Sequence, residues 1–187
     1  MSSREKILAA VRANKPYEVA LPAVPDFAGD ASVEKFTAVL QAIGGQVVEV
    51  RDPARLEEVV RHLYPTARNV ASDVISPNVL VTATTPIAGL AAVELAVLRG
   101  EFGVAENGAV WVSEAAMLHR ALPMITQHLA LVLSRHSLVA TMHQAYARLP
   151  AVGGYGTFLA GPSKTADIEQ SLVIGAHGAR SMTVFLV

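Results

Sequence analysis

Apolar residues recur along the chain at two spacings, one typical of helices and the other typical of strands. Apolar positions three or four apart predict a helix at residues 31–43, ended by Gly44-Gly45, and another that begins at Asp52-Pro53. Between them, a β-branched run at residues 46–50 predicts a strand. This alternation of strands and helices favours parallel pairing with helical crossovers.

The rest of the chain continues this alternation. Asn107-Gly108 separates two extended runs and is typical of a tight hairpin turn. The run at residues 125–133 is almost wholly apolar, as expected of a strand buried on both faces. We therefore predict an α/β fold, in which a mostly parallel sheet is flanked by helices and carries one central hairpin. The other predicted strands are residues 68–72, 79–82, 101–106, 109–113, 156–160 and 182–187, and the other predicted helices are residues 89–99, 139–149 and 165–174.

The N-terminal part of the chain follows a different pattern. A serine caps a helix whose apolar residues Ile7, Leu8 and Val11 share one face. Three prolines before residue 26 then predict an extended linker, because each ring fixes φ and removes a hydrogen-bond donor. The sequence thus predicts an N-terminal helical arm with a Pro-rich linker at residues 1–30 and an α/β domain at residues 31–187.

Composition and charge narrow the classes of function. The 187 residues include 15 Lys and Arg against 16 Asp and Glu, so the formal net charge is −1. A nucleic-acid surface, which needs clustered positive charge, is therefore not expected. Hydrophobic residues make up 52% of the chain and charged residues only 17%. This apolar excess predicts that a partner protein, or a second copy in a homo-oligomer, covers part of the surface.

The chain contains no cysteine. Disulfides, thiol nucleophiles, thiolate zinc sites and cysteine-ligated iron–sulfur clusters are therefore excluded within these residues. The histidines form no H-E-x-x-H pattern, so we expect no dedicated metal site. No run approaches the ~18 uncharged apolar residues of a membrane span, and charges at positions 4–6 interrupt any secretory signal. We expect a cytoplasmic protein.

The densest polar segment is GPSKTADIE at residues 161–169, between a predicted strand and a predicted helix. Ligands of parallel sheets bind at the carboxyl ends of strands, and the first N–H groups of a helix attract anions. Lys164 would add a cation there, and Ser163 and Thr165 would add hydroxyl groups. The alternative is an ordinary helix cap, in which Asp167 and Glu169 complement the helix dipole.

Two further segments combine glycines with reactive side chains. In GVAENG at residues 103–108, Glu106 beside Gly108 could act as a base or nucleophile, or be the solvated tip of a hairpin. In GAHGAR at residues 175–180, His177 and Arg180 flank Gly178, where the backbone could approach a ligand closely. The alternative for this segment is a surface loop that ends a helix.

Together with LPMITQHLALV at residues 122–132, these segments resemble the LUD-domain family in its lactate-utilisation protein C branch. The resemblance extends over residues 73–187. It implies a fold similar to the sugar-phosphate isomerases, CoA transferases and formyltetrahydrofolate cyclo-ligases. It also implies a role in oxidising L-lactate to pyruvate with partner proteins that carry the iron–sulfur clusters, and no cofactor in this chain. By this resemblance, the residues that match the family's pattern and are candidates for the site are Glu106, Gly108, Gly161, Ser163, Thr165, Asp167, Glu169, His177 and Gly178.

Three hypotheses follow. The leading one is a non-redox component of a lactate-utilisation system that binds a small anion at the carboxyl ends of the strands. Ser163, Lys164 and Thr165 would hold the anion, and His177 and Arg180 would close the site. The second is a free-standing enzyme that transfers acyl groups or acts like the cyclo-ligases, with Glu106 and Asp167 as candidate catalytic groups. The third is a purely structural module whose polar loops are helix caps.

Overall fold

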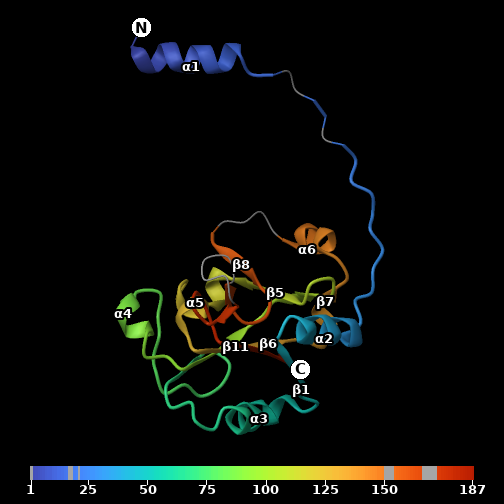
Figure 1. Cartoon of the computed structure of the whole chain (residues 1–187), viewed down its shortest axis with the longest axis vertical. Coiled ribbons are helices and arrows are strands. Elements are labelled where there is room, and N and C mark those ends of the chain that lie inside the picture. The colour runs from blue at the N-terminus through green and yellow to red at the C-terminus, as the bar shows by residue number, and fades with distance from the viewer. Residues whose placement is uncertain (1, 17–18, 21, 150–153, 166–171) are drawn as a thin grey trace.

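The computed structural model describes residues 2–16, 19–20, 22–149, 154–165 and 172–187. Its centre is a five-stranded sheet in which every neighbouring pair is parallel (Figure 1). The middle strands are apolar on both faces, which is why their sequences are continuous apolar runs. The strand order is β1 (Gln46–Glu49), β11 (Ser181–Leu186), β6 (His128–Leu133), β3 (Leu95–Arg99) and β2 (Val70–Ser72).

A second sheet of four strands lies over one face of the parallel sheet, and β4 and β5 form its hairpin (Figure 1). The predicted central hairpin is confirmed, but its turn is longer than Asn107-Gly108 alone. Val104 pairs with Ala109, so residues 105–108 all belong to the turn. Glu106 therefore lies in the turn and does not end a strand. The strand order is β7 (Leu138–Val139), β4 (Phe102–Val104), β5 (Ala109–Ser113) and β8 (Gly156–Leu159).

Helices and the second sheet enclose the parallel sheet as outer layers. Leu56 and Val60 of α3 pack against one face, on Val97, Ala130 and Phe185. The other face packs against α2 and the second sheet. The helices are α1 (Ser3–Ala13), α2 (Val33–Ala42), α3 (Leu56–Leu63), α4 (Ile87–Leu90), α5 (Leu122–Ile125) and α6 (Met142–Arg148), with 3-10 turns η1 (Pro53–Arg55), η2 (Glu114–Ala116) and η3 (Arg135–Ser137).

Helix α1 stands apart from these layers, at the end of an extended segment (Figure 1). Ser2 and Glu5 form a capping box at its start, but it buries no side chain. The segment contacts the layered part at Phe27, whose ring centroid lies 4.4 Å from that of His143 in α6. Among the described residues, no helix is both long and apolar enough to cross a membrane.

Four predicted elements before residue 150 are wrong in part or in whole. Residues 89–99 form no single helix, because α4 ends at Leu90 and the apolar run that follows becomes strand β3, buried between β2 and β6. Residues 79–82 form no strand; Val79 instead donates its N–H to the Val70 carbonyl oxygen at 3.1 Å. The runs predicted at residues 125–133 and 139–149 are each divided, with α5 before β6 and β7 before α6.

The helix predicted at residues 165–174 is wrong at both ends. Lys164–Thr165 forms β9 and Val173–Ile174 forms β10, and these two strands pair antiparallel. Residues 166–171 between them, including Asp167 and Glu169, lie outside the described residues. The described part of GPSKTADIE thus leads into a small hairpin.

Candidate functional site

Two of the predicted segments meet in one cavity of about 260 Å³, which we call the loop cavity. It lies between the chain that follows β8 and the chain that precedes β11. The backbones are joined directly, since Ser163 N–H donates to the Ala179 carbonyl oxygen at 2.9 Å and Gly175 N–H to the Ser163 carbonyl oxygen at 3.0 Å. Of the predicted residues, Gly161, Ser163, Lys164, His177 and Gly178 line this cavity.

Close backbone approach explains two glycines of the loop cavity. A Cβ on Gly178 would lie 3.1 Å from the Ser163 Cβ. Gly161 has φ +70°, and a Cβ there would lie 3.1 Å from the Ile43 carbonyl oxygen at the end of α2. Any larger side chain at these positions would push the two segments apart or strain the backbone.

Lys164 lies beside the carboxyl end of α2, where a Cβ on Gly44 would be only 3.3 Å from its Nζ atom. The last carbonyl groups of a helix carry partial negative charge, so an ammonium group is stabilised there. The side chain is exposed and also lines the loop cavity. Lys164 can therefore complement the helix end and present a positive charge to a bound anion.

The predicted position of the site relative to the parallel sheet is wrong. The strand before Gly161 is β8, which pairs antiparallel in the second sheet. His177 and Gly178 precede β11 and so lie at an amino end of the parallel sheet. The loops therefore do not meet at the carboxyl ends of the parallel strands, because β8 pairs with β5 and adds no strand to that sheet.

The remaining predicted residues lie elsewhere. The Glu106 carboxylate accepts a hydrogen bond from the Met142 N–H at 2.7 Å and so caps the start of α6. Gly108 has φ +71° and packs against the backbone of Leu40 in α2. Thr165 is half-buried in β9. Arg180 lines a second cavity that shares no residue with the loop cavity.

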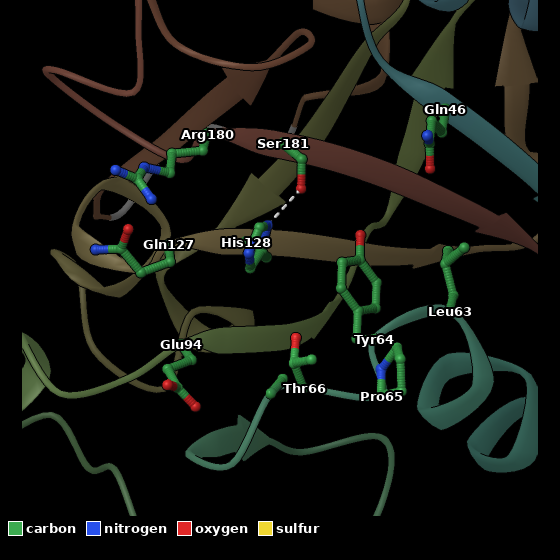
Figure 2. Close-up of a pocket in the computed structure, with 11 residues that line it drawn as sticks. Gln46, Leu63, Tyr64, Pro65, Thr66, Glu94, Gln127, His128, Arg180 and Ser181 are labelled. Atoms are coloured by element: carbon green, nitrogen blue, oxygen red, sulfur yellow. Dashed lines mark hydrogen bonds between the residues drawn. The ribbon is translucent and has the colours of Figure 1, made fainter.

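This second cavity, of about 460 Å³, lies where the strands of the parallel sheet begin (Figure 2). We call it the amino-edge pocket. The strand register aligns its residues, because Ser181 of β11 pairs with His128 of β6, which pairs with Leu95 of β3. Its polar lining consists of Gln46, Tyr64, Thr66, Glu94, Gln127, His128, Arg180 and Ser181.

Hydrogen bonds hold two rings in the amino-edge pocket. His128 Nδ1 and Ser181 Oγ are 2.8 Å apart, and the Tyr64 hydroxyl is 2.7 Å from Thr183 Oγ1. The His128 and Tyr64 ring centroids are 5.5 Å apart. Figure 2 shows both rings facing the space between the strands and the loop after α3. The rings are therefore fixed before any ligand arrives.

Two titratable groups of this pocket have shifted pKa values. Backbone N–H groups of Asn69 and Arg68 donate to the Glu94 carboxylate and lower its pKa, so Glu94 is ionised at neutral pH. Burial lowers the pKa of His128, and the positive charge of Arg180 lowers it further, against an opposing effect of Glu94. The His128 imidazole is therefore neutral at pH 7. Within the described residues, no three His, Asp or Glu side chains gather as metal ligands do.

Sequence reasoning missed Glu94, His128 and Tyr64 as site residues. The helix predicted at residues 89–99 contains Glu94 in its interior and so conceals its place before β3. The sequence does contain a signal for this pocket. A polar residue stands immediately before each of three apolar runs, namely Glu94, His128 and Ser181. Because parallel strands begin at one edge, such residues come together in space.

Comparison with known proteins identifies relatives for the second part of the chain. The LUD domain family matches residues 88–187. A lactate utilization protein C from Shouchella clausii is 30% identical over 91 residues, which are 46% of this chain and 40% of that protein. The uncharacterized protein YkgG from Escherichia coli is 28% identical over 92 residues, with the same two shares. The aligned part thus spans about 40% of the length of these curated relatives.

A solved structure shares the fold. It is a DUF162 family protein from Deinococcus radiodurans, with a TM-score of 0.58 and 18% sequence identity. The alignment covers 83% of this chain and 95% of that one. The predicted α/β architecture, with a mostly parallel sheet, is confirmed.

Proposed function

This chain belongs to the LUD domain family, and from that premise we propose that it is a non-redox component of an L-lactate utilisation system. The name of its relative from Shouchella clausii, lactate utilization protein C, supports this role. Partner proteins would carry the iron–sulfur clusters that oxidise lactate to pyruvate. The absence of cysteine from these residues supports that division, because such clusters are held by thiolates.

Within this role, the loop cavity binds a small anionic ligand. The observation that carries this proposal is that Ser163-Lys164 and His177-Gly178, from two separate polar segments, line one cavity. Lys164 supplies a point charge, and Ser163 and His177 supply hydrogen-bonding groups beside it. Hydrogen bonds to a charged group are stronger than neutral ones, so Lys164 sets the preference for an anion.

The acyl-transfer alternative has less support. A nucleophilic carboxylate must be able to reach an acyl group, whereas the Glu106 carboxylate is bonded to the first turn of α6. Capping of α6 accounts for a carboxylate at this position. Glu106 is thus a structural residue in the proposed function.

The proposal is tested by growth on L-lactate of cells that depend on this protein. Lys164→Gln and His177→Gln should impair growth, whereas Lys35→Gln, which changes an exposed lysine on α2, should not. Calorimetric titration of the purified full chain with L-lactate and pyruvate should show binding that Lys164→Gln weakens about tenfold or more, because a charge-assisted hydrogen bond is lost. Co-purification from lactate-grown cells should recover iron–sulfur proteins.

Two results would contradict the proposal. Unimpaired growth of both cavity variants would remove the loop cavity as the functional site. Absence of iron–sulfur proteins from the eluate of the wild-type chain would remove the proposed partners.

A further inference from the structure

We propose that the amino-edge pocket is a second ligand site, and that it binds an organic carboxylate with a hydroxyl or keto oxygen on the adjacent carbon and an apolar tail. This inference stands on the pocket's own residues. The pocket and the loop cavity have no lining residue in common. Failure of either proposed site therefore leaves the other intact.

Arg180 and Gln127 form the anion-binding end. The backbone N–H of Arg180 donates to the backbone carbonyl oxygen of Gln127 at 2.8 Å. The two side chains therefore start from neighbouring chain segments at the same edge of the sheet (Figure 2). The ion pairs found in the described part of the chain do not include Arg180. A guanidinium group matches a carboxylate with two parallel hydrogen bonds.

The charges around this end favour a carboxylate over a phosphate ester. Arg180 is the only Lys or Arg among the described residues of the lining, and Glu94 is ionised in the same pocket. A phosphate monoester carries nearly two negative charges at neutral pH, which one arginine beside a carboxylate compensates poorly. A ligand with a single negative charge can pair with Arg180 and leaves less uncompensated charge in the pocket than a phosphate ester does.

His128 forms the middle of the site. Its Nδ1 atom is engaged by Ser181 Oγ at 2.8 Å, so Nε2 is the ring nitrogen left for a ligand. Ser181 directly follows Arg180 and pairs with His128, and all three residues line the pocket. A ligand held by Arg180 can therefore present an oxygen on the carbon next to its carboxylate to the imidazole. The Ser181 hydroxyl can donate to Nδ1 or accept from it. Nε2 can therefore donate a hydrogen bond to a keto oxygen or accept one from a hydroxyl group.

The apolar end is formed by the last residue of α3 and the chain that follows it. Leu63, Tyr64, Pro65 and Ala67 line it, and the Tyr64 ring is held by its hydroxyl contact with Thr183. The cavity of about 460 Å³ is larger than a three-carbon acid requires. A flat or branched apolar tail would fill this part against Tyr64 and Pro65.

The test uses three probes that share one ring and differ in polar groups. They are 3-phenyllactate, 3-phenylpropionate, which lacks the hydroxyl, and 3-phenyllactamide, which lacks the charge. In calorimetric titration of the full chain, 3-phenyllactate should bind most tightly and 3-phenylpropionate several-fold more weakly, because one hydrogen bond is lost. The amide should bind at least tenfold more weakly, because the interaction with Arg180 is lost.

Variants assign each preference to a residue. Arg180→Gln should remove the preference for acid over amide, and His128→Gln the preference for the hydroxy acid over 3-phenylpropionate. Arg99→Gln, an exposed arginine at the opposite edge of the sheet, is the matched control and should change neither. Ser181→Ala removes only the hydroxyl that holds the imidazole, and should weaken 3-phenyllactate binding even if His128→Gln does not fold.

Equal binding of the three probes, or absence of binding by the wild-type chain, would overturn the proposal. Unchanged preferences in folded Arg180→Gln and Ser181→Ala would also overturn it. Loss of growth on L-lactate in the loop-cavity variants has no bearing on these titrations.

Discussion

At the scale of single residues, the first positions of neighbouring strands decide the chemistry of the amino-edge pocket. His128 begins β6 and Ser181 begins β11, and parallel pairing sets them side by side. Neither residue is unusual by type, and each stands immediately before an apolar run. Burial lowers the pKa of the His128 imidazole, and the nearby Arg180 lowers it further, so the ring is neutral at pH 7.

His128 makes the stability of the fold depend on pH. Its pKa in the folded chain lies below the usual 6.5, so its contribution to stability is fully present above pH 6.5. That contribution is lost as the pH falls from 6.5 toward the folded pKa, because the unfolded chain takes up the proton first. The charged groups acting on the ring are Arg180, which favours the neutral form, and Glu94, which favours the charged form.

Urea unfolding between pH 8 and pH 5 measures this dependence. The wild-type free energy of unfolding should fall more steeply below pH 6.5 than that of His128→Gln, which has no ring to protonate. Below about pH 5, protonation of Glu94, whose folded pKa is also lowered, should reduce stability in both proteins. Parallel curves from pH 8 to pH 5 would contradict the assigned direction for His128.

At the scale of elements, the turn at residues 105–108 is where the hairpin packs against α2. Gly108 adopts φ +71°, and a Cβ there would lie 3.0 Å from the Leu40 Cα. The sequence pattern predicted the hairpin because Asn-Gly turns are local. It did not predict the contact with α2, because nothing in the turn's own sequence specifies the helix that packs on it.

Gly108→Ala should therefore destabilise the chain. The left-handed backbone alone costs a residue with a Cβ about 1–2 kcal/mol, and the contact with Leu40 adds to that cost. Gly89→Ala is the matched control, since Gly89 lies in α4 and its added Cβ would meet only the Thr85 methyl group at 3.6 Å. Urea unfolding should show a loss for Gly108→Ala and little change for Gly89→Ala. Equal free energies of unfolding for the two variants would contradict the close approach.

At the scale of the whole molecule, stability comes from the layers and not from the N-terminal arm. Helix α1 buries no side chain, and the described residues before Phe27 are all exposed. Burial of apolar surface is the main source of stability, so this arm contributes little. Its amphipathic face remains available for a contact outside these layers.

Removal of residues 1–26 should leave the thermal unfolding midpoint almost unchanged. Phe27→Ala in the full chain should instead lower the free energy of unfolding by about 1 kcal/mol, because it removes a ring that, although partly exposed, packs on His143 of α6. Circular dichroism during heating measures both. A large drop in the midpoint after the truncation would show that the arm packs on the body.

The sequence by itself determined the local features of this protein: the hairpin, the apolar strands, the helix caps and the exclusion of thiolate chemistry. Periodicity extends over a few neighbouring residues, so these features needed no knowledge of the fold. Periodicity gave a wrong prediction at residues 89–99. The apolar residues there form strand β3, because pairing between β2 and β6 buries them.

Only the tertiary structure decided which residues share a site. His177 and Arg180 are close in sequence, yet they line different cavities, whereas Glu94 and Arg180 line the same one. The reason is that strand order and register are set by non-local pairing of apolar surfaces. A change in that pairing would leave every local pattern unchanged and would disperse both sites.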